Sequence, residues 1–244
     1  MFVSSEHVYK GTYLASSPAD RKKLLHNLYF TRALLLLEEH LRIPDQHRSI
    51  LDWMSIIWIE DTDEYYLQHK SLGSLPQSEE EYEMVSTKVE TNVKVLRRGS
   101  HVNRLIELEK DPSNFQAHND DICQACIQHC YLRYLLNIGD SGTWNILVRR
   151  DGIRGICGID FEEIRSNTHQ SSRDPLTLLL SKVSKRQREL YGPYTNSIQV
   201  FPKRIDADDA LATALSTSFK LDVEQINVRI ETYLSAINGK QTSG

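Results

Sequence analysis

The sequence predicts an α+β fold, and three observations support this prediction. Residues 6 to 14 and 50 to 69 contain β-branched and aromatic side chains in the pattern of strands. The residues from Pro18 to Leu41 instead repeat apolar side chains with helical spacing, and most of the chain after residue 78 is helical in pattern. With 244 residues, the chain can bury a sizeable core in one domain, or in one domain with two lobes.

Composition and charge argue against several classes of function. The formal net charge is −4, and the densest basic stretch, Lys182 to Arg188, is short, so we do not expect nucleic acid as a partner. The longest apolar run, Ala33 to Leu37, is far below the roughly 20 residues that span a bilayer. The region after Met1 does not have the pattern of a signal peptide. We therefore expect a protein that does not span a membrane and is cytoplasmic or otherwise intracellular.

The first elements are a short strand and a long helix. Residues 6 to 14 alternate in the manner of a strand that contains Lys10. Ser17 can cap a helix, Pro18 suits its first position, and Asp20 follows the cap by three residues. Together these residues predict that a helix begins at Pro18.

A β-hairpin and a hinge are expected next. Residues 50 to 60 and 64 to 69 are rich in aromatic and β-branched side chains, and the acidic turn Asp61-Thr62-Asp63 separates them. Residues 71 to 77 (SLGSLPQ) indicate a hinge. A capping-box pattern then predicts a helix over Ser78 to Gly99.

Three cysteines are expected on one helix that Asp120 caps. Cys123, Cys126 and Cys130 follow the spacing i, i+3, i+7, which places them on one helical face. This spacing favours buried thiols in a reducing compartment over disulfides. A metal site that also uses His129 is the alternative, although three cysteines along one helix seldom converge on one zinc ion.

The last third of the chain is expected to be helical. Asp174-Pro175 predicts the start of one helix, which Gly192-Pro193 ends, and two further helices are expected within residues 206 to 238. The elements then divide the chain into three parts: residues 1 to 70, the hinge 71 to 77, and a mostly helical part, 78 to 244.

Asp140, Asn145 and Asp160 form the candidate site. Asp151-Gly152 predicts a turn between two short antiparallel strands, and this turn would return Asp160 to the end of the hairpin where Asn145 begins. Neighbouring strands lie about 4.8 Å apart, so an amide oxygen and a carboxylate at this end could share one hard cation such as Mg²⁺. Asp140, in the preceding loop, could orient an attacking hydroxyl or accept its proton. Local loop capping is the alternative role for Asp140 and Asn145.

This stretch resembles the catalytic and metal-binding loops of the protein-kinase-like superfamily, particularly its atypical branches. The spacing Asp140-x4-Asn145 matches, and Ile159-Asp160-Phe161 stands where that family has its metal-binding Asp-Phe-Gly. Gly139 before the aspartate is similar to lipid kinases and to aminoglycoside or choline kinases. Glu162, in place of glycine, is again similar to the choline-kinase type.

The resemblance implies a two-lobed kinase-like fold with a reduced N-terminal lobe of residues 1 to 70 and a mostly helical C-terminal lobe. It implies ATP and Mg²⁺ as cofactors and transfer of the γ-phosphate to a hydroxyl acceptor, which could be a lipid, a protein or a small molecule. In this assignment Asp140 is the base, Asn145 and Asp160 hold the metal ion, and Lys10 contacts the nucleotide phosphates. An exposed strand lysine is the alternative for Lys10.

Two rival functions remain open from the sequence. Only nine residues precede Lys10, so we expect the two strands and glycine-rich flap of the family to be missing or replaced. Gly142 stands in place of the family's usual Lys or His. Both departures favour a catalytically inactive, pseudokinase-type interaction module. A helical binding protein unrelated to kinases would require that the hairpin between Asn145 and Asp160 does not form.

Overall fold

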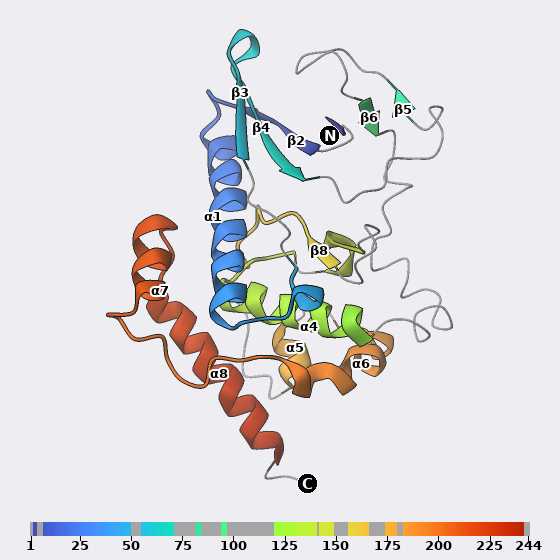
Figure 1. Cartoon of the computed structure of the whole chain (residues 1–244), viewed down its shortest axis with the longest axis vertical. Coiled ribbons are helices and arrows are strands. Elements are labelled where there is room, and N and C mark those ends of the chain that lie inside the picture. Colours follow the sequence, from blue (N-terminus) through green and yellow to red (C-terminus); the bar gives the residue numbers. More distant parts are fainter. Residues whose placement is uncertain are drawn as a thin grey trace.

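The α+β class predicted from the sequence is confirmed by a computed structural model of the chain. The structure describes residues 2–3, 7–49, 55–70, 82–83, 94–96, 120–140, 142–148, 156–165, 174–179 and 183–241. A β-sheet lies at one end of the molecule and most helices lie at the other, with the long helix α1 between them (Figure 1). The expected hinge 71–77 and the Asp151-Gly152 turn lie outside the described residues.

The sheet contains six antiparallel strands in the order β3-β4-β2-β1-β6-β5. Their bounds are β1 (Phe2–Val3), β2 (His7–Leu14), β3 (Ser55–Ile59), β4 (Glu64–Lys70), β5 (Tyr82–Glu83) and β6 (Lys94–Leu96). The predicted hairpin is confirmed, because β3 pairs with β4 and a short 3-10 turn, η2 (Glu60–Thr62), joins them. Asp63 completes this turn in the left-handed conformation, with φ of 51°.

Strands β5 and β6 correct one expectation. They fall within the span Ser78 to Gly99, which the capping-box pattern predicted as a helix, and that prediction is wrong at these residues. A capping box is a local signal, whereas β6 pairs with β1 from the start of the chain. The sheet therefore includes strands that follow the expected hinge.

Helix α1 (Pro18–His40) begins as the sequence predicts. The Ser17 hydroxyl accepts a hydrogen bond from the Asp20 backbone N–H at 3.2 Å, and Pro18 occupies the first turn. Its buried apolar side chains, which include Leu24, Leu28 and Leu34, belong to the main hydrophobic core. Helix α1 packs against both β2 and α4, so it links the sheet to the helical part.

Helix α4 (Asp120–Leu135) lies in the middle of the helical part and contacts α1, α5, α6 and α8. Cys123, Cys126 and Cys130 are buried in the core and are not in disulfides, as expected from their spacing. Burial extends beyond their face to most of the helix, which is typical of a helix covered on all sides. Among the described residues, no group of three or more His, Cys, Asp or Glu side chains could hold a metal ion, which gives the cysteine–zinc alternative no support there.

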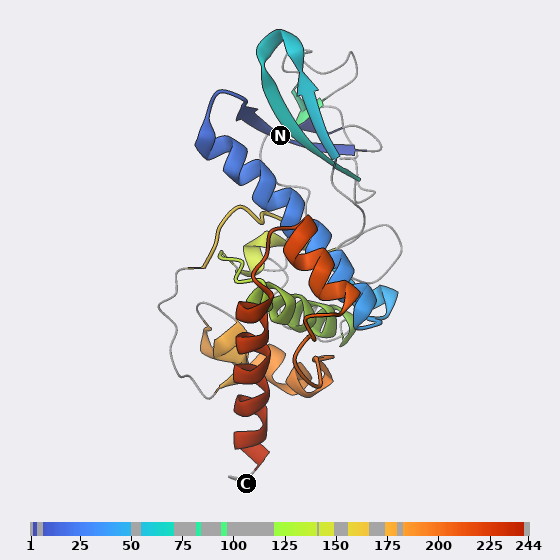
Figure 2. The ribbon, with the colours of Figure 1, turned by 90° about the vertical axis from the view of Figure 1, so that its left-hand side faces the viewer.

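Short helices and one long helix complete the helical part (Figure 2). They are α5 (Pro175–Leu179), α6 (Lys185–Tyr191), η5 (Gly192–Ser197), α7 (Ala210–Thr213), the π-helix η6 (Ala214–Ser218) and α8 (Val223–Gln241). The single helix expected from Pro175 to Gly192 is thus two, and Ser184 caps the second through a capping box with Gln187. In the described segments, none of the helices has the length and apolar character needed to cross a bilayer.

A second, two-stranded sheet carries the candidate site residues. Strands β7 (Ile146–Val148) and β8 (Ile156–Gly158) are antiparallel, which confirms the predicted hairpin. Directly beyond this pairing, the Ile159 N–H donates to the Asn145 carbonyl at 2.9 Å. Asn145 and Asp160 therefore leave the ribbon at the same end.

Gly158 fixes how this ribbon packs on α4. A Cβ atom at position 158 would lie 2.3 Å from His129 Cε1 and 2.4 Å from His129 Nε2. His129 is fully buried, so its ring has little room to retreat. The Gly158 N–H also donates to the Ser49 carbonyl at 2.9 Å, which holds the strand down at this point.

We predict that Gly158→Ala lowers the free energy of unfolding by about 1–3 kcal/mol, because the added methyl group overpacks against His129. Equilibrium urea unfolding measures this change. Gly239→Ala in α8 is the matched control, since nothing lies within 4 Å of its new Cβ. The control should raise stability by up to about 1 kcal/mol, and an equal loss in both variants would contradict the packing argument.

Candidate functional site

The buried guanidinium of Arg133 joins the two loops that carry the predicted site residues. Arg133 Nη2 donates to the carbonyl oxygens of Gly139 at 2.7 Å, of Asp140 at 3.2 Å and of Asp160 at 3.2 Å. Arg133 Nη1 donates to the Ile159 carbonyl at 3.1 Å. One side chain, 1% exposed, thus binds the backbone on both sides of the site.

Burial lowers the pKa of Arg133 to about 10, and the nearby carboxylates of Asp140 and Asp160 oppose this shift. The guanidinium therefore stays charged at neutral pH. Its charge lies 5.0 Å from the centre of the buried Phe161 ring, a distance suited to a cation–π contact. Arg133 is thus a fixed positive charge beneath the two aspartates.

The same two loops also pair through their backbones. Ile138 and Ile164 form an antiparallel bridge, and the Gly139 N–H donates to the Glu163 carbonyl at 2.8 Å. A Cβ atom at Gly139 would lie only 3.2 Å from the Arg165 nitrogen and from Glu163 Cβ. The close approach of the two loops therefore favours glycine at position 139, directly before Asp140.

Asp140 and Asn145 contact each other directly. Asn145 Nδ2 donates to Asp140 Oδ2 at 2.7 Å and to the Asp140 carbonyl at 2.9 Å. Asp140 has φ of 44°, a left-handed conformation that Asp tolerates better than most residues. The amide nitrogen of the buried Asn145 faces Asp140. The amide oxygen of Asn145 is therefore not the atom that binds Asp140.

Lys10 forms ion pairs with two acids on the loop after β8, Asp160 and Glu162. Its Nζ lies 3.0 Å from Asp160 Oδ1 and 2.6 Å from Glu162 Oε1. The side chains of Lys10 and Asp160 are 31% and 39% exposed, whereas that of Glu162 is 17% exposed. The ammonium and the Asp160 carboxylate are therefore reachable from solvent, and Lys10 is not simply an exposed strand lysine.

A β-bulge in β2 lets two of its side chains reach the same carboxylate. Side chains three positions apart in a regular strand point to opposite faces, but the pairing of β2 with β4 shifts register between Lys10 and Tyr13. The Tyr13 hydroxyl accordingly donates to Glu162 Oε1 at 2.6 Å, beside the Lys10 ammonium. Burial and this hydrogen bond raise the pKa of Tyr13, so the phenol remains a donor.

Two opposing effects set the pKa of Glu162. Burial alone would raise it, but the hydrogen bonds from Lys10 and Tyr13 outweigh burial and hold the pKa below its ordinary value. Glu162 is therefore a carboxylate at neutral pH and keeps both partners in place.

Helix α1 holds the second loop through two neighbouring side chains. The Phe161 N–H donates to Asn27 Oδ1 at 3.0 Å, in a buried contact. His26 Nδ1 lies 3.1 Å from the Glu162 carbonyl oxygen, which can only accept, so this nitrogen is the donor. The position of Asp160 thus depends on α1 as well as on Arg133.

A buried polar chain supports the site from beneath. Ser49 donates through its hydroxyl to Glu38 Oε1 at 2.6 Å and through its N–H to the same oxygen at 2.7 Å. His129 Nδ1 lies 2.7 Å from Ser49 Oγ, and all three residues have 0% exposure. Burial, followed by the Arg133 charge, holds the pKa of His129 well below its ordinary value, so the ring is neutral.

The structure thus brings the four predicted site residues together as two pairs, Lys10 with Asp160 and Asp140 with Asn145. The sequence did not indicate an acidic partner for Lys10. In the structure Glu162, two residues after Asp160, pairs with Lys10. Arg133 was also missed, although an arginine within the apolar run CYLRYLL could have indicated a buried charge.

The oxygen atoms present suit a hard divalent cation better than a soft one. Asp160 offers a partly exposed carboxylate and Asn145 an amide oxygen, at the same end of one ribbon. Mg²⁺ typically takes one or two protein oxygens and completes its shell with phosphates and water. The described residues contain no larger cluster of acids, histidines or cysteines that would form an all-protein metal site.

Comparison with known proteins assigns no family to this chain. No protein-family model matches it, and neither the curated proteins nor the solved structures include a significant match. What the site does must therefore be inferred from its own side chains.

We predict that Arg133→Met lowers the free energy of unfolding by more than about 3 kcal/mol, because a buried charge is removed and four backbone carbonyl groups lose their donor. Urea unfolding provides the measurement. Arg204→Met is the control, since Arg204 forms its ion pairs with Glu224 and Glu231 at the surface. Comparable losses in the free energy of unfolding of the two variants would show that Arg133 is not the link between the loops.

We also predict a pH-dependent contribution from Glu162. Its folded-state pKa is lowered, so the stability that it contributes is fully present above the unfolded-state pKa and is lost as pH falls through the folded-state value. The stability difference between wild type and Glu162→Gln should be constant above about pH 6 and shrink below about pH 4.5.

Urea unfolding at several pH values tests this, with Glu189→Gln as control. Glu189 is exposed and lies 3.8 Å from Lys185, so its replacement should change stability little. A wild-type advantage over Glu162→Gln that grows as pH falls would contradict the assignment.

Proposed function

We propose that this protein is an ATP- and Mg²⁺-dependent phosphotransferase of the kinase-like superfamily, which transfers the γ-phosphate to a hydroxyl acceptor. The observation that most supports this function is the pairing at the end of the β7–β8 ribbon. Lys10 of β2 contacts Asp160 on one loop, Asp140 on the other loop contacts Asn145, and Arg133 binds the backbone of both loops. Phosphoryl transfer depends chiefly on such positioned charges.

Each side chain has a distinct role in this proposal. Asp160 and the amide oxygen of Asn145 would hold Mg²⁺, which when bound neutralises phosphate charge. The Lys10 ammonium has three donors, so it can keep its contact with Glu162 while it binds phosphate oxygens. Asp140 would orient the acceptor hydroxyl and take up its proton, while the Asn145 amide fixes the carboxylate through Oδ2.

The arrangement of elements supports a kinase-like, two-lobed interpretation. The sheet with Lys10 and the helical part with Asp140 meet along α1, whose Asn27 and His26 bind the loop of Asp160. A nucleotide between these parts would contact residues from both. The acceptor, whether a lipid, a protein or a small molecule, is not distinguished by these contacts.

A binding module without catalysis is the second candidate, and one observation favours it. The Lys10 ammonium already lies against two carboxylates, Asp160 and Glu162, which neutralise the charge that phosphate would need. In a pseudokinase-type module the ion pairs of Lys10 with Asp160 and Glu162 would permanently link β2 to the loop after β8. Nucleotide titration separates the two candidates.

We predict that wild type binds ATP in a Mg²⁺-dependent manner and that Asp160→Asn weakens this binding at least tenfold, because a metal ligand is lost. Isothermal titration with Mg-ATP and with ATP plus EDTA measures the metal-dependent part. Asparagine suits the φ of 62° at position 160, and Lys10 keeps Glu162, so the Tm should change by less than about 3 °C.

Asp206→Asn is the matched control, because the side chain of Asp206 is exposed and forms a surface ion pair with Lys203. Asp140→Asn should retain ATP binding yet lower ADP formation by about 10²-fold or more, since the proton acceptor is lost. Absence of ATP binding by the folded wild type would overturn the phosphotransferase proposal and support the binding module. Wild-type ADP formation by Asp140→Asn would exclude Asp140 as the base.

A further inference from the structure

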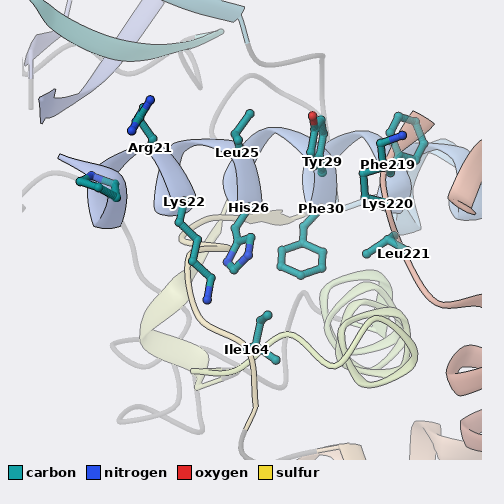
Figure 3. A pocket seen from close by; sticks show the side chains of 11 residues that line it. Arg21, Lys22, Leu25, His26, Tyr29, Phe30, Ile164, Phe219, Lys220 and Leu221 are labelled. Atoms are coloured by element: carbon teal, nitrogen blue, oxygen red, sulfur yellow. The ribbon is translucent and has the colours of Figure 1, made fainter. Parts of the chain in front are cut away.

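An apolar groove with a basic rim lies outside the candidate site. Its volume is about 510 Å³, and α1, the loop after Phe161 and the segment between η6 and α8 line it (Figure 3). Its apolar lining includes Leu25 and Phe30 of α1, together with Ile164 and Leu221. Leu25 and Ile164 are 41% and 52% exposed, which is high for apolar side chains of this size.

Two neighbouring stripes of α1 form one wall of the groove. Arg21, Leu25 and Tyr29 follow an i, i+4 spacing, as do Lys22, His26 and Phe30, so each stripe runs along the helix (Figure 3). A second hollow of about 350 Å³ shares Phe30, Ile164 and Leu221 with the first and extends it toward α8. The groove is therefore elongated along the helix.

Cations lie at both ends of this apolar lining. Arg21 and Lys22 are at the start of α1, and Lys220 lies beside Tyr29 and Phe30 at the other end (Figure 3). None of the three cations is in an ion pair with another described residue. The chain as a whole carries a net charge of −4, so this local surplus of positive charge is distinctive.

The helix itself does not account for Arg21 and Lys22. The N-terminal end of a helix dipole is positive, and cations near the first turn are unfavourable there. Asp20 is the residue that suits this end, where its N–H meets Ser17. Arg21 and Lys22 therefore gain no stabilisation from the helix dipole, and no acidic side chain among the described residues forms an ion pair with them.

We propose that this groove binds an acidic, amphipathic helix of a partner protein. Lys22 and Phe30 are eight residues apart, which is about 12 Å along α1, and Lys220 lies at the Phe30 end. Acidic residues seven or eight positions apart on a partner helix span about the same distance, with apolar residues between them facing Leu25 and Ile164. A single-headed anionic amphiphile would leave one of the two basic ends unmatched.

The groove is separate from the phosphate-binding residues proposed above, so this inference does not require nucleotide binding. His26 nevertheless lines the groove and contacts the Glu162 carbonyl. A partner in the groove would therefore lie next to the loop that carries Asp160.

Two synthetic peptides of about 15 residues test the proposal. Both carry Leu and Phe on one helical face, and one has Glu pairs at its ends where the other has Lys pairs. Fluorescence anisotropy should show micromolar binding of the Glu peptide to the full-length wild-type chain and at least tenfold weaker binding of the Lys peptide. Raising the salt from about 50 mM to about 500 mM should weaken binding of the Glu peptide.

The variant Arg21→Glu/Lys22→Glu should weaken binding of the Glu peptide at least tenfold without a fall in Tm, because acids suit this end of the helix. Lys220→Asn should weaken it less, and asparagine suits the φ of 57° at this position. Lys185→Glu/Lys203→Glu changes the net charge by the same amount at exposed sites away from the groove and should bind as wild type does.

Three kinds of result would overturn the proposal. The first is a lack of charge dependence, seen as equal binding of the Glu and Lys peptides or as equal losses of binding in the two double variants. The second is self-association of the wild type that Arg21→Glu/Lys22→Glu abolishes, which would make a second copy the occupant. The third is no binding of the Glu peptide together with binding of dodecanoate or anionic vesicles that the same variant abolishes.

Discussion

The buried charge of Arg133 is the interaction on which the arrangement of the site depends. Its guanidinium is removed from water and compensated by four backbone carbonyl groups, so the loops around Asp140 and Asp160 must stay where those carbonyls meet it. Phe161 covers the charge from one side. The carboxylates of Asp140 and Asp160 are not the groups that bind Arg133. They remain at the edge of the site, where solvent and ligands can reach them.

The local parts of this architecture could be predicted from the sequence, because the signals are local. Ser17 and Pro18 mark the start of α1, and the ribbon after Asn145 follows from two short apolar runs on either side of an Asp-Gly dipeptide. The strands β5 and β6 could not be predicted, because β6 pairs with β1 at the start of the chain and β5 pairs with β6.

Most of the contacts that define the site lie between segments far apart in the sequence, and no local pattern specifies them. Glu162 becomes the partner of Lys10 only because a β-bulge turns Tyr13 to the same side and α1 holds the Glu162 carbonyl. A buried arginine within an apolar run was visible in the sequence, but its four acceptors were not. Positions 140, 145 and 160 could be predicted as site residues from the sequence, because they lie close to one short hairpin that brings them together.

The contact between Lys10 and Asp160 spans 150 residues, and this has a consequence for biosynthesis. The lysine leaves the ribosome long before the aspartate, and at roughly 5–20 residues per second the delay is on the order of ten seconds. During that interval the first strands can pair among themselves, but their ammonium group has no acid from the later loop to meet. The site is thus assembled late, by docking of an early sheet onto a newly made ribbon, and such non-local closure is the slow kind of folding step.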